Sequence, residues 1–235
     1  MGLAPRWQAR HTRRVAELAA ARRIGEPQMS YDVASSGPSE RREAAAAALA
    51  NLLDGNRRFA AGGLVDNKMS VAERSALVAG QHPRAVVLGC VDSRVPPEVV
   101  LGQGIGDLLT VRTAGQSLSG VAIGSIEFGA RALGIPLVVV LGHTHCGAVL
   151  AAMGDHDLTG HLGDLIGDVA ARLVDLVGDD PIRATGGNLQ ATVDALRHFG
   201  TIERDGDPAH VVGLLYHLDT GLVTVEDDDG LLGDS

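Results

Sequence analysis

The segments AVVLGCVDSR (residues 85–94) and LVVVLGHTHCG (residues 137–147) decide the fold of this chain of 235 residues. Each opens with a short, continuous apolar run rich in valine and leucine, which is typical of a strand buried on both of its faces. Each run ends at a glycine, and residues with distinctive side-chain chemistry follow at once. The two cysteines of the chain, Cys90 and Cys146, are divided between the two segments. We therefore expect two buried strands whose carboxyl ends carry a functional site.

The rest of the chain alternates between strand and helix patterns. This alternation predicts an α/β fold, in which a mostly parallel central sheet has helices on both faces. A turn signal at residues 219–221 joins two apolar runs into a hairpin, which would add an antiparallel edge strand. The expected helices are Arg41–Ala61, Val71–Ala79, a short one through Val100, Val121–Leu133, Leu162–Val177 and Leu189–Phe199, and the other expected strands are Leu108–Arg112, Val211–His217 and Leu222–Glu226.

Glycines are expected to interrupt the last helical region of the chain, roughly residues 162–199. A cluster at residues 178–181 and the pair Gly186-Gly187 both interrupt its helical pattern. Because glycine is a poor helix former, we expect the region to be split at both places.

Residues 1–42 differ in composition from the remainder and predict a flexible, basic extension with a linker. Up to Gln28 they contain six Arg and two Glu, whereas the whole chain has a formal net charge of −9. Residues 30–40 are rich in Ser, Gly and Pro, as linkers are. We expect residues 43–235 to form a single α/β domain. The fold is also expected to have an N-terminal helical extension.

The composition excludes several classes of function. A pI near 5.4 argues against a nucleic-acid partner, which would require a basic face. No apolar run approaches the roughly 20 residues that span a bilayer, so no membrane association is expected. The charged N-terminus does not resemble a signal peptide, and with two cysteines this predicts a reducing, cytoplasmic location. In that setting the cysteines are expected to bind a metal or to take part in catalysis.

The polar residues at the two strand ends predict a zinc site. In an open α/β sheet, ligands bind beyond the carboxyl ends of the strands, so Cys90 and His143 would meet if their strands are neighbours. Cys146 follows His143 by three residues, and a first helical turn would return it to the same point. Two thiolates and one imidazole suit Zn²⁺. For the fourth position, Asp92 would close the tetrahedron as in a structural site, and a water would leave it open for catalysis.

Asp92 and Arg94 form a candidate switch at this site. In extended backbone, residues two apart point the same way, so the guanidinium can pair with the carboxylate through two hydrogen bonds. When Asp92 bonds Arg94, a water can reach the metal, and when it does not, Asp92 can bind zinc. His145 is either a proton shuttle near the metal or a solvent-facing side chain.

The two segments resemble the signature of the β-class carbonic anhydrases, C-x-D-S-R followed by H-x-x-C, at every fixed position. The resemblance extends over roughly residues 45–226. It implies that Cys90, His143 and Cys146 bind zinc, with Asp92 as the fourth ligand or as the partner of Arg94. The reaction that it implies is the reversible hydration of CO2 to bicarbonate and a proton by zinc hydroxide, which the Asp92–Arg94 pair orients.

The resemblance also implies an α/β sheet whose N-terminal helix packs across a second copy, giving a homodimer or homotetramer. The chain departs from the family at two places. Gln103 lies one position before the glutamine of plant-type members, and Val87 stands where bicarbonate-regulated bacterial members have tryptophan. We therefore expect no inhibitory bicarbonate site.

Two alternatives stay open on the sequence alone. One is a hydrolase of a CO2-like sulfur compound, carbonyl sulfide or carbon disulfide, that uses the same site. The other is a non-catalytic zinc protein in which Asp92 is permanently bound to the metal.

Overall fold

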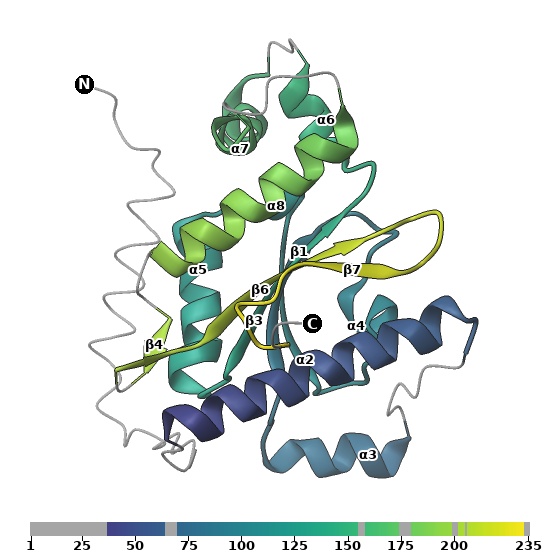
Figure 1. The fold of residues 1–235 in the computed structure, drawn as a ribbon, viewed down its shortest axis with the longest axis vertical. Coiled ribbons are helices and arrows are strands. Elements are labelled where there is room, and N and C mark those ends of the chain that lie inside the picture. The colour runs from purple at the N-terminus through teal and green to yellow at the C-terminus, as the bar shows by residue number, and fades with distance from the viewer. Residues whose placement is uncertain are drawn as a thin grey trace, which may run out of the picture. The chain divides into compact units, whose positions relative to one another are not determined.

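The computed structural model describes residues 37–63, 70–154, 158–173, 180–198, 202–204 and 206–232 (Figure 1). All of them belong to one compact unit, Val33–Ser235. The expected basic extension lies largely outside the described residues, and the boundary that we placed at residue 42 stays a prediction. The helices are α2 (Pro38–Ala60), α3 (Val71–Ala76), α4 (Pro97–Val100), α5 (Gly120–Glu127), α6 (Gly147–Met153), α7 (Gly160–Ala171) and α8 (Pro181–His198), and the strands are β1 (Ala85–Cys90), β2 (Leu108–Thr113), β3 (Leu137–His143), β4 (Glu203–Arg204), β5 (Asp207–Pro208), β6 (His210–Tyr216) and β7 (Val223–Asp227).

A five-stranded sheet forms the centre of the fold, in the order β2-β1-β3-β6-β7. The first four strands are parallel, and β7 pairs with β6 in the antiparallel direction at one edge. Every residue of β1 and β3 is buried, as their continuous apolar runs predict. The mostly parallel α/β sheet with an antiparallel edge strand is therefore confirmed. The two-residue strands β4 and β5, which pair with each other, were not predicted.

Helices cover both faces of this sheet, and the alternation of side chains along the strands shows which helix lies on which face. Gly129, two residues after the end of α5, lies against Val86, and Leu189 of α8 lies against Gly142 on the same face. The other face carries Val87 and its neighbours, which form one apolar core with the buried side of α2. In Figure 1, α8 and α2 accordingly lie on opposite sides of β6 and β7.

Helix α2 is tied to the sheet through the buried side chain of Asn56. Its amide Nδ2 donates to the carbonyl oxygens of Val100, at the end of α4, and of Gly221, each at 2.9 Å, and its Oδ1 accepts from the backbone N–H of Val223 at 2.8 Å. Gly221 lies in the β6–β7 connection, and Val223 is the first residue of β7. One side chain therefore joins three segments that lie far apart in the sequence.

The expected split at Gly186-Gly187 is wrong, because α8 runs without interruption from Pro181 to His198. One side of this helix is buried against the sheet, and a Cβ at Gly186 would meet nothing within 4 Å, so this position does not contribute to the contact. Packing of the buried side therefore outweighs the helix-breaking tendency of two glycines.

The expected helix Val121–Leu133 forms in two parts, α5 and a π-helical turn, Phe128–Ala132. Such a turn holds one extra residue and is rare in helices. The second residue of this turn, Gly129, lies so close to β1 that a Cβ there would come within 2.4 Å of Val86 Cγ2. The close approach explains why glycine stands at this position.

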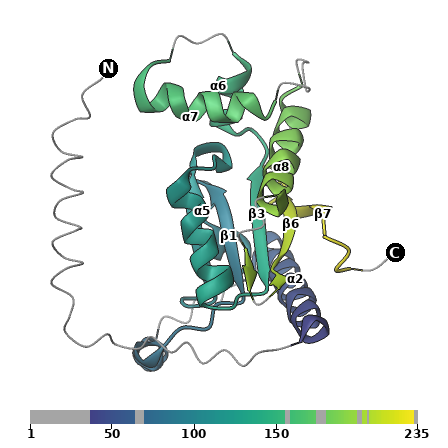
Figure 2. The ribbon, with the colours of Figure 1, turned by 90° about the vertical axis from the view of Figure 1, so that its left-hand side faces the viewer.

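Helices α6 and α7 lie at the carboxyl ends of the parallel strands, beyond the sheet (Figure 2). Cys90, Cys146, Val149, Val169 and Leu173 form a separate apolar cluster there. Within the part of the chain that the structure describes, no helix has the length and apolar character needed to cross a membrane.

Candidate metal site

Neighbouring strands deliver the first two predicted ligands to the same edge of the sheet. Cys90 is the last residue of β1 and His143 is the last residue of β3, and these strands are adjacent and parallel. Cys146, three residues after the end of β3, follows a turn and is the N-cap of α6, so it comes just before the helix and not in the expected first helical turn. The condition on which the prediction depended, that the two strands are neighbours, is therefore met.

The three side chains form a compact, buried group that could hold a metal ion. The two sulfur atoms and a ring nitrogen of His143 all lie within 4.8 Å of one another, and the two Sγ atoms are 3.9 Å apart. All three residues are buried, with His143 completely inaccessible to solvent. A set of two sulfurs and one nitrogen is typical of zinc sites with an open fourth position.

The histidine ring is oriented for metal binding. Its Nδ1 lies 2.9 Å from the carbonyl oxygen of Thr144, and because a carbonyl only accepts, Nδ1 carries the proton. In the neutral imidazole the other nitrogen, Nε2, then has a free lone pair. It is buried and has no hydrogen-bond partner among the described residues. A buried polar atom without a partner is costly, and a metal ion at this point would satisfy it.

The cysteine pair is set up to hold negative charge. The hydrogen bond from the Cys146 thiol lowers the pKa of Cys90 to about 4, and the backbone N–H of Gly115, 3.4 Å from its Sγ, acts in the same direction. The Cys90 thiolate and burial in turn raise the pKa of Cys146. The shared hydrogen bond thus favours a thiolate at Cys90, and a divalent cation would stabilise a second thiolate at Cys146.

Asp92 is held away from the cysteines by Arg94, as the candidate switch requires in one of its two states. The side chain of Arg94 donates from Nε to Oδ1 at 3.0 Å and from Nη2 to Oδ2 at 2.7 Å, and its backbone N–H donates to Oδ1 at 2.9 Å. These bonds hold the pKa of the Asp92 carboxyl at about 2. Oδ2 still lies only 3.9 Å from Nε2 of His143, so the carboxylate is next to the candidate metal site.

Two groups that support the site were not assigned from the sequence. Arg112 of β2 donates from Nε to the carbonyl oxygen of Cys90 at 2.8 Å and from Nη2 to that of Asp92 at 2.6 Å. Gly115 supplies the backbone N–H that points at the Cys90 sulfur. Arg112 could have been noticed as the one basic residue in an otherwise uncharged strand. Its partners could not have been predicted, because they are backbone carbonyl oxygens, which no sequence motif identifies.

The remaining residues of interest lie as follows. The side chain of His145 is exposed, and its carbonyl oxygen accepts from Arg94 Nη2 at 3.4 Å, so the described contact comes from its backbone. Gln103 is buried beside Gly55 of α2 and donates to the carbonyl oxygen of Leu101 at 2.8 Å. Val87 is packed in the core beneath α2. Neither Gln103 nor Val87 belongs to the cysteine–histidine group.

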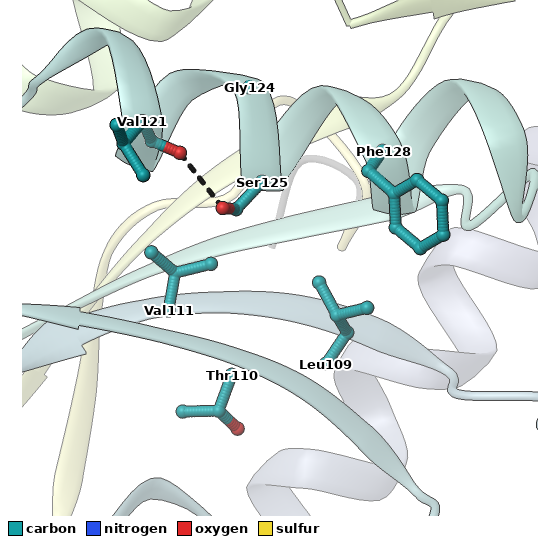
Figure 3. A pocket seen from close by; sticks show the side chains of 7 residues that line it. All are labelled: Leu109, Thr110, Val111, Val121, Gly124, Ser125 and Phe128. Atoms are coloured by element: carbon teal, nitrogen blue, oxygen red, sulfur yellow. Dashed lines mark hydrogen bonds between the residues drawn. The ribbon is translucent and has the colours of Figure 1, made fainter. Parts of the chain in front are cut away.

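The described surface has a mainly apolar hollow and a second one of mixed polarity, each of about 430 Å³. The apolar hollow lies where Gly147 and Ala148 of α6, which follow Cys146 in the chain, face Leu162 and Ile166 of α7. The second lies between the edge strand β2 and α5. Figure 3 shows the side chains of Leu109, Val111, Val121 and Phe128 around it.

Comparison with known proteins agrees with this geometry. The family model described as carbonic anhydrase matches residues 85–223, which include both strand ends and the whole cysteine–histidine group. The chain belongs to the carbonic anhydrase family. A curated relative, carbonic anhydrase 2 of Mycobacterium tuberculosis, is 38% identical over 198 residues, which cover 78% of this chain and 93% of that protein.

Solved structures place the chain in the β class of the family. The β-carbonic anhydrase of Coccomyxa, determined with acetazolamide, is similar with a TM-score of 0.60 and 25% identity, over 75% of this chain and 85% of that one. One of two tetrameric β-carbonic anhydrases from Sordaria macrospora has the same fold, with a TM-score of 0.58 and 24% identity, over 65% of this chain and 84% of that one. The resemblance read from the sequence is therefore confirmed, and this enzyme is a carbonic anhydrase.

Proposed function

We propose that the chain hydrates CO2 to bicarbonate and a proton at a zinc ion held by Cys90, His143 and Cys146. The observation that carries the proposal is the buried Nε2 of His143, which has a free lone pair, no partner in the described structure, and two sulfur atoms beside it. These residues fit zinc because the donor set is soft, compact and protected from solvent. When bound, zinc would lower the pKa of a water and so supply hydroxide near neutral pH.

Asp92 and Arg94 would decide whether water reaches the metal. With both of its oxygens bonded to Arg94, the carboxylate is an acceptor that can orient an incoming hydroxyl group rather than a fourth ligand. Without Arg94 it would lie within reach of the metal, given its 3.9 Å distance from the histidine nitrogen. This arrangement supports a catalytic site over a purely structural one, because a structural site has no need of a competitor for its carboxylate.

The first experiment measures zinc content and CO2 hydration by stopped flow on the same preparation. We expect one zinc per chain and a rate that rises between about pH 7 and pH 9, because the reacting water must lose its proton. Stoichiometric zinc without hydration at any pH would contradict the catalytic proposal. A profile that is flat or falls over this interval would contradict the mechanism.

The second experiment tests the switch through Arg94. We expect Arg94→Ala to lower the hydration rate by about 10–100-fold, because Asp92 loses all of its side-chain hydrogen bonds to arginine and becomes free to bind the metal. Arg94→Lys keeps the charge but cannot make the bidentate hydrogen bonds, so its hydration rate should lie between those of the wild type and Arg94→Ala. A crystal structure of zinc-loaded Arg94→Ala would then show a carboxylate oxygen of Asp92 in the place of a water at the metal. An active Arg94→Ala variant with a water-bound metal would contradict the switch.

We further infer that two or four copies assemble through the hollow between β2 and α5. β2 is the outermost strand on its side of the sheet, and Val121 and Phe128 beside it are 82% and 40% exposed. An exposed strand edge with an apolar border is a pairing surface, and a similar fold occurs in tetrameric enzymes. The expected packing of α2 across a second copy of the chain stays a prediction. The apolar side of α2 is already buried against the sheet of its own chain. Sedimentation of wild type and Val121→Glu would show whether the assembly depends on this surface.

The reduced cysteine pair also supports a reducing compartment, and we propose the cytoplasm.

A further inference from the structure

The turn that follows β2 has an unusual backbone conformation. Gly115 and Gln116 are consecutive residues with φ angles of +60° and +52°. Glycine adopts such angles freely, but glutamine does so rarely, and the surrounding structure must hold it there. The conformation of this turn directs the N–H of Gly115 at the Sγ of Cys90.

A single side chain of α8 holds this turn from the other side. Asn188 is 1% exposed, and its Nδ2 donates to the carbonyl oxygen of Gly115 at 3.0 Å and to Oε1 of Gln116 at 3.3 Å. Gln116 in turn donates from Nε2 to the carbonyl oxygen of Leu141 at 3.1 Å, in the strand that ends at the histidine of the metal group. Asn188 therefore connects α8 with both strand ends of the site.

The amide of Asn188 is itself fixed by charged groups from α7 and the loop beyond it. Its Oδ1 accepts from Nε of Arg172 at 3.0 Å. Nη1 of Arg172 donates to Oδ2 of Asp168 at 2.7 Å, and the same oxygen accepts the backbone N–H of Leu118 at 3.2 Å. Because the arginine can only donate, the orientation of the amide is determined, with its two N–H groups facing the turn.

The other buried polar residues on α8 that the structure describes do not reach the site. The hydroxyl groups of Thr185 and Thr192 donate to carbonyl oxygens of their own helix, at Pro181 and Asn188. Asn188 differs from them in that its donors cross to another element, and one of them ends on Gly115, whose N–H points at the Cys90 sulfur. General stabilisation of the helix does not account for this arrangement.

We propose that Asn188 is a positioning residue for the metal site, which acts through the Gly115–Gln116 turn to keep a backbone N–H on the Cys90 thiolate. The inference rests on the proposed metal-binding function. Groups that orient a ligand from outside the first coordination sphere typically change metal affinity by about 10–100-fold when they are removed. No motif of the family signature contains Asn188.

The test compares Asn188→Asp with Thr192→Val in the full-length protein. Aspartate has the shape of asparagine and still accepts from Arg172, but it has no N–H groups to donate to Gly115 and Gln116. Thr192→Val removes another buried hydroxyl from the same helix and leaves the turn untouched. Zinc affinity is measured by competition with a chelator, and the thiolate-to-metal charge-transfer band is recorded after replacing zinc with Co²⁺.

We expect Asn188→Asp to weaken zinc binding by about 10–100-fold and to shift the Co²⁺ band, because the Cys90 sulfur loses its aligned donor. Thr192→Val should bind like the wild type, even if both variants lose similar thermal stability. If Asn188→Asp does not fold, Asn188→Ser, whose shorter side chain cannot reach the turn, should show the same loss. Wild-type affinity and an unchanged band in a folded Asn188 variant would overturn the inference.

The two proposals fail in different ways. A wild-type protein that binds neither zinc nor Co²⁺ would refute the metal-binding function itself. A wild-type protein that binds both, together with an Asn188 variant that binds them equally well, would refute the role of Asn188 alone.

Discussion

Replacing Asn56 with alanine should be one of the more destabilising single changes outside the metal site. The side chain makes three hydrogen bonds, to Val100, Gly221 and Val223, with donor–acceptor distances of 2.8 to 2.9 Å, and it is 2% exposed. At about 1 kcal/mol for each bond, the loss is about 3 kcal/mol. The backbone groups that Asn56 serves would be left without a partner. For a domain of this size, the expected decrease in Tm is about 6–12 °C.

Asn51→Ala is the matched control, because it changes the same residue type in the same helix. Asn51 is only partly buried and makes no side-chain hydrogen bond within the described part of the chain. Both substitutions gain the same helix propensity, about 0.6 kcal/mol, so their difference isolates the hydrogen bonds of Asn56. Calorimetry and urea unfolding of the metal-loaded protein measure that difference. Equal Tm values for Asn51→Ala and Asn56→Ala would refute the reasoning.

Two further predictions concern the acid stability and the packing of the fold. Two hydrogen bonds from Arg197 hold the pKa of Asp227 at about 2, so the pair stabilises the protein above pH 4 and is lost as the pH falls towards 2. Asp227→Asn should therefore lower the free energy of unfolding at pH 7 by about 1–2 kcal/mol, a range that allows for solvent screening of this partly exposed pair. In urea titrations near pH 2, the variant and the wild type should be equally stable. Gly129→Ala should destabilise by about 1–3 kcal/mol, because its Cβ would overlap Val86, whereas Gly124→Ala, with nothing within 4 Å, should be neutral or stabilising by calorimetry. The packing argument fails if these two alanine variants unfold at the same temperature.

The centre of the site could be predicted because the residues that form it follow two unmistakable strands. The continuous apolar runs of β1 and β3 predict strands that are buried on both faces. Because neighbouring parallel strands end on the same side of the sheet, they bring Cys90 and His143 together. The pairing of Asp92 with Arg94 was expected from an extended backbone, but a turn closed by the bond from Val95 N–H to the Asp92 carbonyl oxygen is what brings the two side chains together. Both strands can be recognised from local sequence patterns, and the cysteine and histidine side chains at their ends indicate a metal site.

The supporting groups could not be predicted, because their partners are set by tertiary packing. Arg112 and Asn188 both bond backbone carbonyl oxygens of distant segments, and a sequence pattern does not record which carbonyl comes near. The same limit explains the error at Gly186-Gly187. Helix propensity predicts a break there, but the buried side of α8, with Asn188 and Leu189, packs against the sheet and keeps the helix continuous.

The parallel pairing of β1 with β3 also determines when during folding a metal can bind. Cys90 and Cys146 are 56 residues apart, and they meet only when these two strands lie side by side. Closing so long a loop is slow compared with forming a helix or a hairpin, so contacts of this kind form late. The complete three-residue site is therefore not present for metal ions before these two strands pair. The rate of metal binding would then report when the central sheet has closed, and a refolding experiment followed by metal uptake would time that step directly.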